Sequence, residues 1–239
     1  FDDFINPVNL VAQRNKFLNK NSYVSPSFNY KQLDINPYKF REQLYKLPVE
    51  DVNDADIQQL YRHVIDNLAN KIDLLTTIGT DDFVYNSLKY YGEPSCTDIA
   101  NARFLLHLNT HHNNNDSKML NADEAIQYFK EQAQVWGLNC RIEKSSKVVA
   151  KAMVNNEKAL LLINKAALFT EKELHAFAYH ELGIHMLTTI NAKKHPLKVF
   201  SLGLTGNTHT QEGLALYSEY CSGSLTIQRL KTIALRVIA

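Results

Sequence analysis

Two histidines and a glutamate stand close together in an otherwise apolar part of the sequence. His180 and Glu181 are adjacent, and His185 follows after Leu182-Gly183-Ile184. Burial of three titratable groups on one helix is unfavourable unless something binds them. A zinc ion held by the two imidazoles, with the glutamate beside it as general base, would meet that need. The alternative is a core in which hydrogen bonds satisfy all three groups.

The spacing of the two histidines differs from that of the common zinc-protease motif. In H-E-x-x-H the histidines are four residues apart and share one face of a helix. Here they are five apart, and on a regular α-helix their side chains would diverge by roughly 140°. A π-bulge would realign them, and Gly183 lowers the steric cost of that distortion. The sequence therefore predicts an irregular helix near Leu182 to Ile184.

A third ligand would decide between these two interpretations, and a candidate lies downstream. The segment from Asn207 to Ala215 reads NTHTQEGLA. Thr210 is a candidate N-cap, which would place Glu212 in the first turn of a second helix. The order His, Glu, His and then Glu on a following helix is that of the two-His-one-Glu zinc peptidases, which leave the fourth metal position to water.

The paired motifs resemble those of a known family. HELGIHML followed by TQEGLALYSEY is similar to the bacterial QEGLA-motif proteins and to the related microtubule-associated tyrosine carboxypeptidases, which use an H-E-x-x-x-H zinc site. An INP segment near the start, LYKLP and LKVFSLGLTG extend the resemblance over most of the chain. It implies a zincin-like metallopeptidase in which His180, His185 and Glu212 bind Zn²⁺ and Glu181 is the catalytic base. Family members usually continue beyond Ala239, which implies that part of the substrate cleft is absent here.

The resemblance also implies an activity. We expect a zinc-dependent carboxypeptidase that removes a C-terminal residue from a protein or peptide, with zinc-bound water activated by Glu181. A non-catalytic regulatory or binding protein on a metallopeptidase scaffold is one alternative, and a zinc endopeptidase or aminopeptidase is another. A carboxypeptidase must also bind a terminal carboxylate, usually with arginine or lysine. Spacing does not choose among the arginines outside the motifs, which include Arg41, Arg62, Arg103, Arg141, Arg229 and Arg236.

Several further residues are candidates for supporting roles. His209 and Tyr217 could donate to an oxyanion, with ordinary packing as the alternative for each. Glu219 lies seven residues after Glu212 on the same helix face and could orient a ligand histidine. We expect His175 on the helix surface and His195 in a solvated connector. The tract from His111 to Asp116 could suggest a metal site, but its composition is typical of a polar surface loop.

The predicted elements give a mainly helical α+β fold. Residues 1–35 show no sustained period and are expected to be irregular. Helices are expected from Asn36-Pro37 to Pro48, from Asp54 to Gly79, from Thr80 to Tyr91, from Thr97 to Leu108, from Asn121 to Trp136 and after Thr170. Residues 147–154 and 159–164 indicate a hairpin, hence a small antiparallel sheet beside the metal-binding helix. We expect a helical N-terminal region over 1–120 and a zincin-like catalytic region over 121–239, packed as one unit.

Composition excludes little but points away from charged partners. The 239 residues carry a net charge of +1, so no bulk electrostatic argument favours nucleic acid or an anionic membrane. No apolar run approaches the about 18 residues of a membrane span. The sequence has three cysteines, an odd number, and they are widely spaced: Cys96, Cys140 and Cys221. This suggests free thiols and a cytoplasmic location. The sequence ends within an amphipathic pattern, so we expect it to be a fragment of a longer protein. The sequence does not indicate the oligomeric state.

Overall fold

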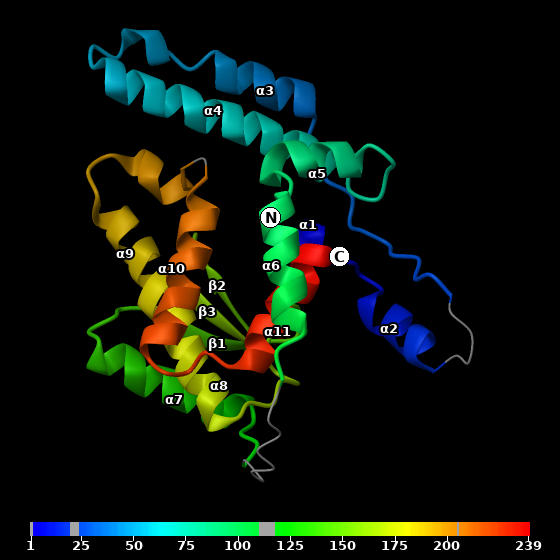
Figure 1. Cartoon of the computed structure of the whole chain (residues 1–239). Helices are drawn as coiled ribbons and strands as arrows, with labels where there is room; N and C mark the ends of the chain where they lie inside the picture. The colour runs from blue at the N-terminus through cyan, green and yellow to red at the C-terminus, as the bar shows by residue number, and fades with distance from the viewer. Residues whose placement is uncertain (1, 20–23, 110–117, 205) are drawn as a thin grey trace. The chain divides into compact units, whose positions relative to one another are not determined.

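The structure, a computed structural model, describes residues 2–19, 24–109, 118–204 and 206–239. The chain forms two compact units, Phe1–Glu93 and Pro94–Ala239. This division differs from the boundary expected at residue 120, because α6 (Cys96–Leu106) packs against α11 (Ile227–Ile238) within the second unit (Figure 1). The tract from His111 to Asp116 lies outside the described residues.

The regular elements among the described residues of the first unit are all helices. Its elements are α1 (Asp2–Ile5), α2 (Leu10–Leu18), α3 (Pro37–Tyr45), the 3-10 helix η1 (Val49–Asp51), α4 (Ala55–Thr76) and α5 (Phe83–Tyr91). The side chain of Asn36 caps α3 as predicted, and the side chain of Asp54 caps α4, whose start was predicted at this residue. The expectation of an irregular start over 1–35 was wrong for α1 and α2, whereas residues 24–35 form neither helix nor strand. Helix α2 buries none of its residues and so has no apolar periodicity to reveal it. Helix α5 begins at Phe83 rather than after Thr80.

The second unit combines helices with one small sheet. Its remaining helices are α7 (Ala122–Val135), α8 (Glu171–Phe177), the π-helix η2 (Ala178–Met186), α9 (Leu187–Lys194), the 3-10 helix η3 (Lys198–Leu202) and α10 (Asn207–Cys221). Capping boxes start α7 at Asn121 with Glu124 and α8 at Thr170 with Glu173, as predicted. The mainly helical α+β fold is confirmed.

The sheet is mixed rather than antiparallel. Its strands β1 (Arg141–Ser145), β3 (Leu160–Asn164) and β2 (Ala152–Asn155) lie side by side in that order. Strands β2 and β3 form the predicted antiparallel hairpin, but β1 joins β3 in parallel. The sequence RIEKS of β1 buries only Ile142 and gives a weak strand signal.

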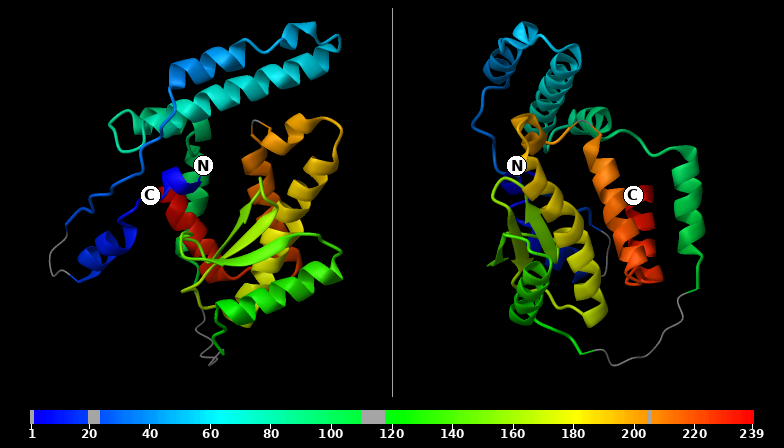
Figure 2. Two further views of the ribbon diagram at one scale, coloured as in Figure 1. Left: turned by 180° about the vertical axis from the view of Figure 1, so that it is seen from behind. Right: turned by 90° about the vertical axis from the view of Figure 1, so that its left-hand side faces the viewer.

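One face of the sheet packs against the helices that carry the candidate site. Leu161 and Ile163 of β3 are fully buried with Phe129 of α7 and with Leu182 and Met186 of η2. This apolar cluster holds η2 against the sheet. Figure 2 shows the helix that contains η2 beside the strands. None of the helices in the described ranges is long and apolar enough to cross a membrane.

Candidate metal centre

The π-helix η2 brings the two histidines together. Helices α8, η2 and α9 follow one another without a break from Glu171 to Lys194, and their middle section has π geometry. In a π-helix the backbone hydrogen bonds join residues five apart, which matches the spacing of His180 and His185. The centroids of their rings are 4.9 Å apart. The predicted irregularity is confirmed, although it extends over Ala178–Met186 and not over a single bulge.

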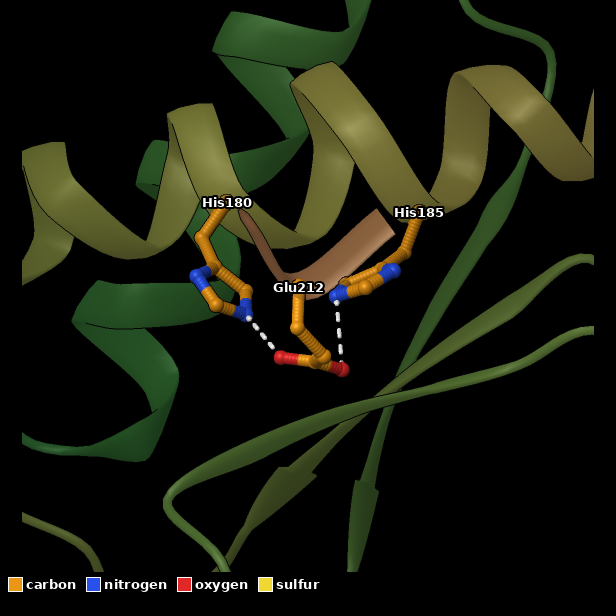
Figure 3. A group of neighbouring side chains, drawn as sticks. All are labelled: His180, His185 and Glu212. Carbon is orange, nitrogen blue, oxygen red and sulfur yellow. Dashed lines mark ion pairs between the residues drawn. The ribbon is translucent and has the colours of Figure 1, made fainter. Parts of the chain in front are cut away.

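Helix α10 supplies the third candidate ligand. Figure 3 shows the Glu212 carboxylate between the two imidazoles, with one oxygen toward each ring. Ala215, one turn later, is fully buried, and a side chain that small allows α10 to lie close to η2. Helix α10 begins at Asn207 and not at Thr210, so Glu212 lies in its second turn. The structure thus brings the three predicted ligands together, although the start of α10, the helix that carries Glu212, was predicted wrongly.

The distances within this group are compatible with a bound metal ion. Glu212 Oε2 lies 3.6 Å from His180 Nε2, and Glu212 Oε1 lies 3.5 Å from His185 Nε2. Both distances exceed the ~3.2 Å limit of an ordinary N–H···O hydrogen bond. Two ligands of a tetrahedral site with bonds of ~2.0–2.1 Å are roughly 3.3 Å apart. The three ligand atoms lie within 4.8 Å of one another, so these residues could hold a metal ion.

His180 is oriented by a buried charged network. Its Nδ1 lies 2.7 Å from Oε1 of Glu219, whose side chain is 1% exposed. Arg229 of α11 donates two hydrogen bonds to the same carboxylate, from Nε at 3.3 Å and from Nη2 at 3.0 Å. Burial alone would raise the pKa of Glu219, but the hydrogen bonds from His180 and Arg229 outweigh it and lower the pKa. When Nδ1–H of the neutral His180 ring donates a hydrogen bond to Glu219, Nε2 carries no proton and is free to bind a cation.

His185 is oriented by a neutral partner. Its Nδ1 lies 3.2 Å from Oε1 of Gln211, which immediately precedes Glu212 on α10. Burial lowers the pKa of His185, so the ring favours its neutral form. Donation from Nδ1 to the amide oxygen again leaves Nε2 without a proton. No role was predicted for Gln211 from the sequence. Its place in the QEGLA segment, directly before Glu212, could have indicated one.

Glu181 lies beside the three candidate ligands but belongs to none of these pairs. It is 8% exposed, and its side chain makes no hydrogen bond with any described residue. Burial raises the pKa of Glu181 to about 7. The interaction with His180 lowers this pKa, and the negative charge of Glu212 raises it. The carboxyl group is thus available to exchange a proton.

A cavity of about 1400 Å³ opens onto this group within the second unit. Glu181, His180, His185 and Glu212 all line it, and Lys151 to Val154 along β2 form part of its wall. A cavity of this size can admit a peptide segment as well as a small molecule.

Other predicted residues lie elsewhere. His209 and Tyr217 are exposed and do not line the cavity, so the structure does not support them as oxyanion donors. His175 is half-buried rather than at the surface, and its Nδ1 lies 2.5 Å from Ser224 Oγ. His195 is exposed, as expected. Of the six candidate arginines, only Arg229 and Arg236 line the cavity.

One protein family matches most of the chain. The sequence model described as microtubule-associated tyrosine carboxypeptidase matches residues 15–239. The chain belongs to this family. Membership in the microtubule-associated tyrosine carboxypeptidase family supports an enzyme of the carboxypeptidase type. Neither the curated proteins nor the solved structures contain a match to the chain.

Proposed function

We propose that this protein is a zinc-dependent carboxypeptidase that removes a C-terminal residue from a protein or peptide. One observation carries the proposal: two imidazole Nε2 atoms and a carboxylate converge within 4.8 Å, beside a buried glutamate, in a chain of a carboxypeptidase family. Tyrosine is the first C-terminal residue to test, because the family is named for it.

Zinc is the metal that best suits this set of donors. Two neutral imidazoles and one carboxylate with an open fourth position are typical of catalytic zinc sites. Purely oxygen sites would favour magnesium or calcium instead. His180, His185 and Glu212 would hold the ion, while Glu219 and Gln211 keep the two rings in the tautomer that binds it.

The chemistry then depends on Glu181. When bound, zinc supplies a Lewis acid that polarises the scissile carbonyl and lowers the pKa of water toward 7. A carboxylate oxygen of Glu181 takes the proton of the attacking water and delivers it to the leaving amine nitrogen. Burial of Glu181 keeps bulk water from competing for that proton. A purely structural metal site would have no use for this base, which argues against a non-catalytic scaffold.

The test uses the purified full chain loaded with zinc and an N-acetylated pentapeptide that ends in tyrosine. We expect free tyrosine as the product, detected by mass spectrometry. Acetylation blocks an aminopeptidase, and internal fragments would identify an endopeptidase. Glu181→Gln should lower kcat by about 10²–10⁴-fold without loss of zinc. Glu131→Gln, an exposed change on α7 outside the cavity, serves as the control. Absence of zinc binding, or equal cleavage by Glu181→Gln, would refute the proposal. Bound zinc without any cleavage would favour a regulatory protein.

A further inference from the structure

A carboxypeptidase needs a cation at a fixed distance from the bond it cuts, and the cavity offers a short set of choices. The cationic side chains that line it are Lys118, Lys151, Lys172, Arg229 and Arg236. Two of the lysines already have carboxylate partners. Lys118 lies 3.4 Å from Glu124, and Lys151 lies 2.6 Å from Glu173.

Distance along the helices separates the remaining three. The Arg229 guanidinium is two hydrogen bonds from the His180 ring, through Glu219 at 3.0 Å and 2.7 Å. In a substrate that loses one residue, the terminal carboxylate lies only one residue beyond the scissile carbonyl, a span of ~4 Å. Arg236 is seven residues further along α11, or about 10 Å. Lys172 is eight residues before His180, or about 12 Å along the α8–η2 run. Neither Arg236 nor Lys172 is linked to a candidate metal ligand by a hydrogen bond among the described residues, as Arg229 is through Glu219.

Arg229 is also the most rigidly held of these cations. Glu219 binds one edge of its guanidinium through Nε and Nη2, and the ring of Phe177 lies 5.8 Å from Cζ. The guanidinium has more donors than these bonds use. Among the described residues, Nη1 has no hydrogen-bond acceptor or ion-pair partner. The side chain is 28% exposed and lines the same cavity as Glu181.

We infer that Arg229 binds the terminal carboxylate of the substrate through the part of its guanidinium that Glu219 leaves free. This inference rests on the proposed carboxypeptidase function and names the residue that makes the site specific for chain ends. A fixed fork of donors suits a carboxylate better than a mobile lysine, because less conformational entropy is lost on binding. Glu219 then has two neighbours with different tasks, since it orients His180 on one side and fixes Arg229 on the other.

The experiment measures binding and does not depend on turnover. The zinc-loaded Glu181→Gln protein is titrated with the N-acetylated pentapeptide that ends in tyrosine. It is also titrated with the same peptide ending in a carboxamide. We expect the acid to bind about 10- to 100-fold more tightly than the amide, as for charge-assisted hydrogen bonds. When Arg229→Gln is added, the affinity for the peptide acid should fall to that for the peptide amide. The affinity for the amide itself should change by no more than about threefold. Arg229→Lys should restore part of the preference.

Two further variants make the test specific. Arg141→Gln, exposed on β1 and outside the cavity, should keep the full preference for the acid. Arg236→Gln should also keep it, because Arg236 lies about 10 Å further along α11. Zinc content is measured for every variant, because Arg229 also contacts Glu219. A merely structural role for Arg229 would weaken acid and amide equally.

The outcomes distinguish this inference from the proposed function. The inference is wrong if the parent protein binds acid and amide alike, if it binds neither, or if the preference survives Arg229→Gln. It is also wrong if the preference disappears with Arg236→Gln instead. An acid preference that requires Arg229, in a protein whose intact Glu181 form cleaves no peptide, would support the inference while refuting the peptidase.

Discussion

The two histidines of the candidate metal centre are held by opposite kinds of partner. His180 donates to Glu219, a carboxylate that is 1% exposed and is itself bound by Arg229. His185 donates to Gln211, a neutral amide, over a longer distance of 3.2 Å against 2.7 Å. We call these the charged arm (His180, Glu219 and Arg229) and the neutral arm (His185 and Gln211).

The difference between the arms assigns them different tasks. A carboxylate partner raises the basicity of its imidazole and fixes the ring, so the charged arm should determine most of the metal affinity. The charged arm also connects three elements, η2, α10 and α11, whereas the neutral arm connects only η2 and α10. Changes of His180 or Glu219 should therefore affect metal binding and folding together. Changes of Gln211, the partner in the neutral arm, should affect metal binding alone, and weakly.

Removal of each histidine gives the largest expected effects. His180→Ala and His185→Ala should each abolish stoichiometric zinc binding, because each removes a ligand. Only His180→Ala should also strongly destabilise the metal-free protein, by about 2–3 kcal/mol against about 1 kcal/mol for His185→Ala, since hydrogen bonds to charged groups contribute more. Urea unfolding in a chelator measures this difference. Equal losses of stability would contradict the distinction between the arms.

Neutralisation of Glu219 should have the next largest effect on zinc affinity. Glu219→Gln keeps the size of the side chain but removes the charge that supports His180. We expect zinc affinity to fall by about 10- to 100-fold, the usual cost of losing a partner of a ligand histidine. Competition with a chromophoric chelator measures it, with Glu131→Gln as the control. Unchanged affinity would mean that the network orients α11 and not the metal ligand.

Truncation of Gln211 tests the neutral arm directly. Gln211→Ala should lower zinc affinity by less than about tenfold, because a neutral hydrogen bond contributes only ~0.5–1.5 kcal/mol. The same chelator competition applies, and the two variants should be measured side by side. A larger effect for Gln211→Ala than for Glu219→Gln would reverse the assignment of the arms.

Features that depend on neighbouring residues could be predicted from the sequence. Asn36, Asp54, Asn121 and Thr170 cap helices where expected, because a cap needs only a few adjacent residues. Strand β1 was missed because it pairs with β3 across a long stretch of chain and buries one apolar side chain. The start of α10 was missed because its N-cap is Gly206, in a left-handed conformation, and has no capping side chain.

In the candidate site, too, the residues within the sequence motifs were predictable and those that depend on the packing of distant elements were not. The motifs name His180, Glu181, His185 and Glu212, and the structure brings the two histidines and Glu212 together. Arg229 could not be selected from the sequence, because its place depends on how α11 packs near α10. The π geometry was predictable from the spacing of the histidines. The role assigned to Gly183 in that geometry is not supported by its surroundings.

Gly183 therefore gives the smallest expected effect. It is not among the residues with a positive φ, and a Cβ atom there would meet Ala178 O and a Trp136 ring carbon at 3.8 Å, which is ordinary contact. Gly183→Ala should leave zinc affinity unchanged and alter the free energy of unfolding by no more than about 1 kcal/mol, with stabilisation as the expected direction, since alanine favours helix. If the π geometry instead depends on glycine, the variant will lose zinc. The π-helix would then be maintained by its sequence, and not, as we argue, by the packing of Leu182 and Met186 against the sheet.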